Sequence, residues 1–153
     1  MNEPRLPPEP RLPKGPLLGV DPGTKRVGIA SATLLGTVHP VCYLDAEPRD
    51  ALFRRIKALA EDRQCVGLVV GLPIDMNGGE GKAAQAARAF GAELERFTGL
   101  PVAFSDERLT SHSAEKKVGE LGLTRKKRKA RVDAVAAALL LEGYLAEGGN
   151  SAE

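Results

Sequence analysis

Residues 17–30 read LLGVDPGTKRVGIA, which is an apolar run that ends at Asp21, a turn over Pro22 and Gly23, and a second apolar run. Proline and glycine are preferred in tight turns, so we expect the chain to reverse between the two runs. Aspartate is depleted in strands, and its position at the end of the first run indicates a role other than packing. The stretch therefore predicts two neighbouring strands with a carboxylate where the first one ends.

The next part of the chain extends this pair of strands. Turn residues at Leu35-Gly36 precede a third strand over about residues 37–43, which completes a meander. Helical spacing predicts a helix that begins near Pro48 and ends at about Arg63. Residues 66–70 are continuously apolar and rich in β-branched side chains, as in a strand that is covered on both faces.

The C-terminal half alternates helices with one more strand. A helix is expected over residues 83–97, a strand over residues 102–105, and a helix that carries Ala114, Val118 and Leu121. A final helix is expected to begin near residues 129–131 and is apolar nearly all round. The order predicts an α/β fold, a mixed sheet of a three-strand meander plus two parallel strands, flanked by helices.

The composition indicates one folded domain. With 153 residues, of which 42% are hydrophobic, the chain has material for one core. Residues 1–16 alternate prolines with charges, so we expect a disordered arm there, one domain over residues 17–147 and a disordered tail over residues 148–153. No stretch approaches the roughly 20 apolar residues of a membrane helix, and no signal peptide is evident, so we expect a cytoplasmic protein.

The cysteines indicate the expected thiol state, and the distribution of charge indicates the expected partner. Cys42 and Cys65 lack zinc-site spacing and lie in or beside apolar runs, so we expect reduced, buried thiols. The net charge of +2 predicts no partner by itself. Residues 125–131, however, read RKKRKAR, a concentrated run of cations that indicates nucleic-acid binding when it lies beside a cluster of acids.

Three acids occupy unusual positions at the ends of core elements. Asp21 ends the first strand, Glu107 follows the strand that begins at Val102, and Asp133 lies near the start of the apolar final helix. Carboxylates that meet without a cation repel one another, whereas a hard divalent cation accepts their oxygens. The pattern predicts a metal site; the alternative is a turn residue, an exposed glutamate and a helix N-cap.

Four segments, in order along the chain, resemble the motifs of the YqgF/RuvX family: residues 18–30, 70–73, 106–110 and 132–137. These are Holliday-junction-resolvase-like proteins of the ribonuclease H-like superfamily, also described as pre-16S rRNA nucleases. The resemblance covers the chain from about Leu17 to Leu145. One departure is the loop at residues 75–78, which reads DMNG where similar proteins tend to read NMDG.

The resemblance implies a ribonuclease H-like nuclease in which Asp21, Glu107 and Asp133 are the metal-binding catalytic acids. It implies two metal ions, Mg²⁺ with Mn²⁺ as a substitute, and hydrolysis of phosphodiester bonds in structured nucleic acid. The leading expectation is processing of the 5′ end of pre-16S rRNA in ribosome biogenesis. The alternatives are a Holliday junction resolvase and, in another class, a binding or assembly factor without catalysis.

Cations near the acids are the expected contacts to the nucleic-acid backbone. Lys25, Arg26 and Arg108 would hold phosphates beside the acids, and the basic run would hold the backbone further out, through Arg125, Lys126, Lys127, Arg128, Lys129 and Arg131. Only 4% of the residues are aromatic, which favours recognition of shape and charge over sequence. RNA or DNA as substrate, internal or terminal cleavage, and monomer or homodimer all stay open.

One further resemblance predicts a different enzyme. The turn at residues 19–24 is similar to the phosphate loop of actin-like and sugar-kinase-like ATPases. Those proteins close two domains over the nucleotide, and this chain has room for one, which argues against that class.

Overall fold

A five-stranded mixed sheet forms the centre of the molecule. The computed structural model describes residues 12–75, 77–106 and 125–148. The strands are β1 (Leu17–Pro22), β2 (Arg26–Ala32), β3 (Val38–Asp45), β4 (Gly67–Leu72) and β5 (Val102–Asp106). They lie in the order β3-β2-β1-β4-β5, with the first three antiparallel and with β4 parallel to both β1 and β5. The predicted meander with two added parallel strands is confirmed.

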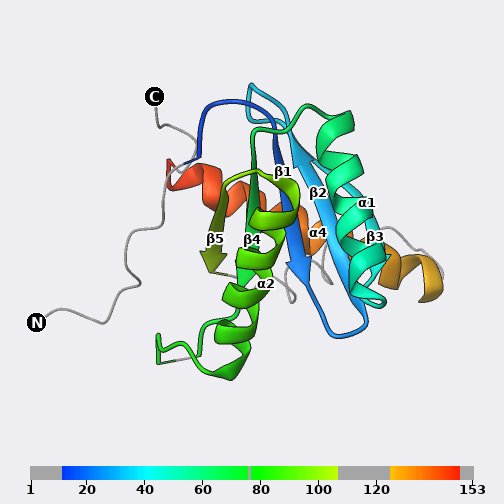
Figure 1. Cartoon of the computed structure of the whole chain (residues 1–153), viewed down its shortest axis with the longest axis vertical. Coiled ribbons are helices and arrows are strands. Elements are labelled where there is room, and N and C mark those ends of the chain that lie inside the picture. Colours follow the sequence, from blue (N-terminus) through cyan, green and yellow to red (C-terminus); the bar gives the residue numbers. More distant parts are fainter. Residues whose placement is uncertain (1–11, 76, 107–124, 149–153) are drawn as a thin grey trace, which may run out of the picture.

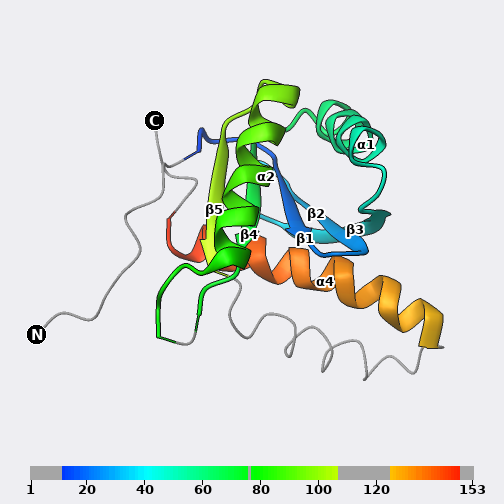
Figure 2. The ribbon, with the colours of Figure 1, turned by 60° about the horizontal axis from the view of Figure 1, so that its bottom comes forward.

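The helices cover both faces of this sheet. Helices α1 (Arg49–Asp62) and α2 (Lys82–Thr98) pack on one face, and α4 (Arg125–Ala146) crosses the other (Figures 1 and 2). Because side chains alternate along a strand, Leu18 and Val20 of β1 enter the core under α1 and α2, whereas Leu17 enters the core under α4. Every residue of β4 is buried, as its continuous apolar run predicts. The helix expected around Ala114 to Leu121 lies outside the described residues.

The final helix begins earlier than predicted. It begins at Arg125 rather than near residues 129–131, so Asp133 lies within the helix, and the N-cap alternative for this residue is wrong. A run of like charges has no apolar period to mark a helix, yet lysine and arginine have high intrinsic helix propensity. The side chains of residues 125–131 lie outside the described part of the structure. No helix among the described residues is both long and apolar enough to cross a membrane.

The folded part also begins earlier than residue 17. Leu12 is 1% exposed and packs with Leu17 and Leu141 under α4. Its N–H donates a hydrogen bond to the Tyr144 hydroxyl at 3.0 Å, and the Val66 N–H donates one to the Pro16 carbonyl at 2.8 Å. The expected boundary of the arm at residue 16 is therefore wrong for residues 12–16. Residues 1–11 and 149–153 lie outside the described residues.

Leu12→Ala is expected to lower the free energy of unfolding by about 2–5 kcal/mol, because it removes a fully buried leucine from the core under α4. Leu35→Ala is the matched control, since Leu35 is 91% exposed and its loss is expected to change stability by less than about 0.5 kcal/mol. Denaturant unfolding of both variants measures the difference. If Leu12→Ala were as stable as Leu35→Ala, residues 12–16 would not belong to the core.

Both cysteines are free thiols, as the sequence predicts. Cys65 is buried, and this burial raises the pKa of its thiol to about 11. Cys42 is only half-buried, less than expected, and burial raises the pKa of its thiol as well. Neither sulfur is therefore poised to be a nucleophile at neutral pH.

Candidate metal centre

Asp21 lies on the face of the sheet that α4 covers. Within β1, Leu17 packs under α4, so alternation places Gly19 and Asp21 on the same face and Pro22 on the opposite one. Asp21 pairs directly with Gly28 of β2. Directly opposed residues of an antiparallel pair share a face, so the position beside the half-buried Asp21 carries no side chain.

Glycines let α4 approach the strands closely at this point. A Cβ atom built on Gly28 would lie 1.9 Å from the carbonyl oxygen of Asp133, and one built on Gly19 would lie 2.6 Å from Cγ of Leu141. The backbone of α4 at Asp133 therefore rests on Gly28, the strand partner of Asp21. Two of the three predicted acids are thus brought together by the packing of a helix on glycine.

Arg26 is the immediate partner of Asp133. Its Nε donates a hydrogen bond to Oδ2 of Asp133 at 2.5 Å, and the two side chains are 33% and 25% exposed. The hydrogen bond and the charge of Asp133 raise the pKa of the Arg26 guanidinium. Its Cζ also lies 5.7 Å from the centre of the Tyr43 ring. The structure places Arg26 against an acid, a contact that the sequence-based assignment of Arg26 to a phosphate did not include.

The third acid lies just beyond the described part of β5. The hydroxyl of Ser105 donates to the Leu140 carbonyl of α4 at 3.4 Å, so alternation places Asp106 on the opposite face from Asp21. Glu107 and Arg108 follow Asp106 in sequence and lie outside the described residues. In the parts of the chain that the structure describes, no three acids, histidines or cysteines are grouped closely enough to hold a metal ion.

The cations predicted to bind phosphate have different positions. Lys25 is exposed in the turn between β1 and β2, and its carbonyl accepts a hydrogen bond from the Ala46 N–H at 2.9 Å. The basic run forms the first turns of α4, which extend beyond the edge of the sheet at β3 (Figure 2). The run therefore lies N-terminal to Asp133 on the same helix.

The described acids fit a hard divalent cation in their chemistry. Asp21 and Asp133 present carboxylate oxygens, the ligands that Mg²⁺ and Mn²⁺ prefer. Arg26 pairs with the Asp133 carboxylate and compensates its charge. Two carboxylates leave room in the coordination shell for a third protein ligand and water.

A family model described as RuvX, Holliday junction resolvase, matches residues 15–147. This chain belongs to the RuvX family. Two similar relatives carry the name "Putative pre-16S rRNA nuclease". The relative from Rhodobacter capsulatus is 43% identical over 136 residues, which cover 88% of this chain and 86% of that protein. The relative from Lactococcus lactis subsp. lactis is 43% identical over 132 residues, which cover 84% and 92%.

The fold of this RuvX chain also matches a solved structure. T. thermophilus RuvC in complex with a Holliday junction substrate superposes with a TM-score of 0.51 at 18% identity, over 88% of this chain and 96% of that one. At 18% identity the match supports only the fold, and this fold is ribonuclease H-like. The predicted family and fold class are both confirmed.

Proposed function

We propose that this protein is a metal-dependent nuclease that hydrolyses phosphodiester bonds of structured nucleic acid, and that its substrate is the 5′ end of pre-16S rRNA. The observation that carries the proposal is the close approach of the Asp133 backbone to Gly28, the strand partner of Asp21, so that residues of two distant sequence motifs lie near one another at one end of the sheet. Membership of the RuvX family and the names of its relatives support the choice of reaction and substrate.

Each residue of the site would have a distinct role in metal binding or phosphate contact. Asp21 would be the central ligand, since β1 lies in the middle of the sheet, with Asp133 from α4 and Glu107 after β5 on either side of it. When bound by these acids, two Mg²⁺ ions, or Mn²⁺ in their place, would supply an activated water and stabilise the charge that develops on the phosphate. Arg26 orients the Asp133 carboxylate through its hydrogen bond. Lys25 and Arg108 would contact the phosphates beside the cleaved bond.

A second candidate function is resolution of Holliday junctions, which the description of the family favours. Symmetric cutting of a four-way junction needs two active sites and hence a homodimer, whereas trimming an RNA end needs only a monomer. A third candidate, in another class, is a binding or assembly factor that keeps the fold without turnover.

Cleavage assays on two substrates separate these functions. One substrate is an RNA that spans the 5′ end of 16S rRNA with its precursor extension, and the other is a four-way DNA junction, each offered in Mg²⁺ and in Mn²⁺. We expect cleavage of the RNA at its extension. Cleavage of the junction alone would favour the resolvase, and cleavage of neither would favour the binding factor.

The basic run is expected to supply affinity rather than chemistry. Each lost phosphate contact lowers the slope of log K against log salt by about 0.7–0.9, so replacing Lys126, Lys127 and Lys129 with alanine should flatten it by roughly two units. The matched control removes three cations elsewhere, with Lys14, Arg55 and Lys57 replaced by alanine. Binding titrations over a range of salt concentrations measure both slopes. Equal slopes for the two triple variants would show that the run does not contact the substrate.

A further inference from the structure

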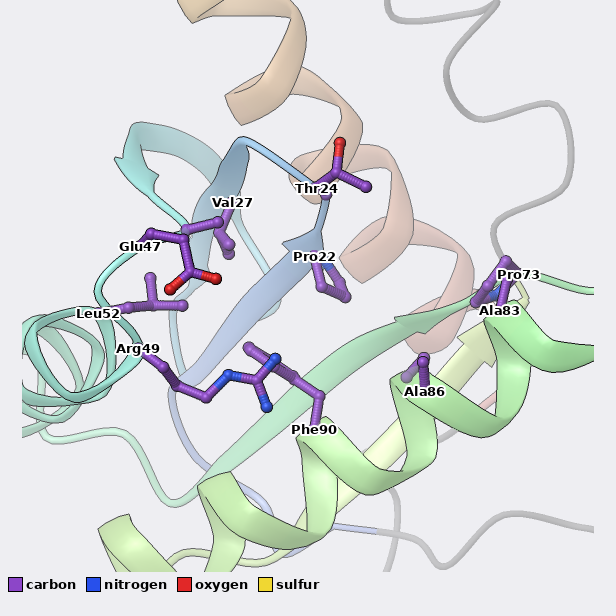
Figure 3. Close-up of a pocket in the computed structure, with 13 residues that line it drawn as sticks. Pro22, Thr24, Val27, Glu47, Arg49, Leu52, Pro73, Ala83, Ala86 and Phe90 are labelled. Carbon is purple, nitrogen blue, oxygen red and sulfur yellow. The ribbon is translucent and has the colours of Figure 1, made fainter.

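A pocket lies on the opposite face of the sheet from Asp21 and Asp133. It has a volume of about 490 Å³ and opens between the β1–β2 turn, the start of α1 and the first half of α2 (Figure 3). We call it the α1–α2 pocket. The residues on which its chemistry depends are Thr24, Glu47, Arg49, Ala83, Ala86 and Phe90.

Arg49 gives this pocket a flat, fixed surface. Its guanidinium Cζ lies 5.3 Å from the centre of the Phe90 ring and 5.8 Å from that of Phe53. One terminal nitrogen also lies 3.4 Å from both carboxylate oxygens of Glu93. Figure 3 shows Arg49 extending from the start of α1 across the pocket toward Phe90 on α2. Ion pair and rings together hold the guanidinium in place.

The charges of the pocket favour a neutral ligand over an anion. Among the described residues that line it, Arg49 is the one cation, and it pairs with Glu93, while Glu47 adds a carboxylate to the wall. Against this described lining, a phosphate would meet the Glu47 carboxylate, with Arg49 already paired to Glu93 as the lining cation that could offset the repulsion. A planar ring with hydrogen-bond donors and acceptors would instead stack on the guanidinium, pack against the alanines and reach Glu47. Nucleobases stack on arginine and aromatic side chains in this way.

The β1–β2 turn connects the pocket to the acids. Pro22, Gly23 and Thr24 line the pocket and follow Asp21 directly, and alternation puts Asp21 and Pro22 on opposite faces of the sheet. A nucleic-acid strand that passes the acids therefore has the pocket just across this turn. The volume lies within the range of about 300–1,000 Å³ that is typical of sites for small ligands.

We propose that the α1–α2 pocket binds one unpaired nucleobase of the substrate, next to the phosphate that is cleaved. The proposal rests on the proposed nuclease function and narrows its substrate. The substrate would be a nucleic acid with an unpaired nucleotide at the cleavage point rather than a continuous duplex. This contact would also supply stacking, which the low aromatic content of the chain led us not to expect.

Two double variants of α2 test the proposal. Ala83→Leu with Ala86→Leu fills the pocket, and Ala89→Leu with Ala92→Leu places the same side chains at the same spacing on α2, outside the pocket. All four alanines are exposed, so both variants are expected to have the same melting temperature as the wild type. Arg49→Gln is a third variant, which removes the stacking surface without adding bulk.

Affinity is measured by fluorescence anisotropy in EDTA, where no cleavage occurs. The probes are an RNA hairpin with a single-stranded 5′ extension, the same RNA with an abasic nucleotide at the base of the extension, and a fully paired hairpin. Filling the pocket should weaken binding of the extended RNA about tenfold, the scale of one stacked base, and leave the paired hairpin unchanged. Arg49→Gln should also weaken binding of the extended RNA. The control variant should bind all three RNAs as the wild type does. Wild-type protein should bind the abasic RNA as weakly as the filled variant binds the extended one.

The pocket proposal would be overturned if filling the pocket weakened binding of the extended and the paired RNA equally. It would also be overturned if filling weakened binding of neither RNA, and another kind of ligand, such as a peptide, would then have to occupy the pocket. Because binding is measured without metal, the proposal is separable from catalysis. If the wild type binds the three RNAs as expected but cleaves none of them in Mg²⁺, the proposed nuclease function is wrong, whereas binding of an unpaired base in the pocket is supported. If the wild type cuts RNA and the filled variant binds normally, only the pocket proposal fails.

Discussion

Asp21→Asn, Glu107→Gln and Asp133→Asn are each expected to abolish hydrolysis. Each substitution keeps the size of the side chain and removes the charge that holds a divalent cation. Residues that act as one unit have non-additive effects, so double variants should be no worse than single ones. Initial rates on the RNA that spans the 5′ end of 16S rRNA, in Mg²⁺ and in Mn²⁺, measure the effect. Asp50→Asn is the matched control, because Asp50 is an exposed acid of α1 that pairs with Arg54 and should be dispensable for cleavage.

These variants are expected to stay folded and to bind nucleic acid without metal. Asparagine at position 133 can still accept the hydrogen bond from Arg26, so losing the charge of this partly exposed pair should cost about 1 kcal/mol. Melting curves and binding in EDTA check both expectations. A single variant that cuts at the wild-type rate would remove its residue from the site, and a variant that unfolds would have to be set aside in favour of one that folds.

Gly28→Ala is expected to have the second largest effect, because it separates the two described acids without changing either. The new Cβ would lie 1.9 Å from the Asp133 carbonyl oxygen, and backbone atoms have no rotamer through which to move away. Helix α4 must therefore shift off β2. We expect a loss of at least about 1–3 kcal/mol in stability, typical of overpacking, together with loss of cleavage under conditions where the protein remains folded.

Gly143→Ala is the matched control for this substitution. A Cβ on Gly143 meets nothing within 4 Å, and the residue lies within α4, where alanine is favoured over glycine by about 0.5–1 kcal/mol. We expect wild-type activity and equal or higher stability, measured by denaturant unfolding and initial rates. If Gly28→Ala behaved like Gly143→Ala, close packing of α4 on β2 would not be what positions Asp133.

Local pattern was enough to predict most of the fold. The turn at Pro22 and Gly23, the continuous apolar run of β4 and the helical spacing of α1 are encoded within single elements, and the structure confirms all three. The start of α4 and the burial of Leu12 were missed because neither has a local period. A lysine and arginine run resembles a solvated loop, and a lone leucine among prolines gains its burial from α4, including Tyr144, and from the sheet.

The site was predictable only in part, for a similar reason. Asp21 is recognisable because an aspartate ends an apolar run, but its proximity to Asp133 depends on a helix that rests on Gly28. The ion pair between Arg26 and Asp133 joins residues that no spacing connects. The α1–α2 pocket is lined from several separate segments, and its key cation, Arg49, looks like an ordinary exposed residue in the sequence.

We propose above all that Asp21, Glu107 and Asp133 form one metal-dependent unit that cleaves nucleic acid. The most direct measurement compares wild-type protein with the triple variant Asp21→Asn, Glu107→Gln, Asp133→Asn on the same structured RNA, in Mg²⁺ and in EDTA. We expect product only from wild-type protein and only with Mg²⁺. Cleavage by the triple variant, or equal cleavage by the wild type in EDTA, would contradict it.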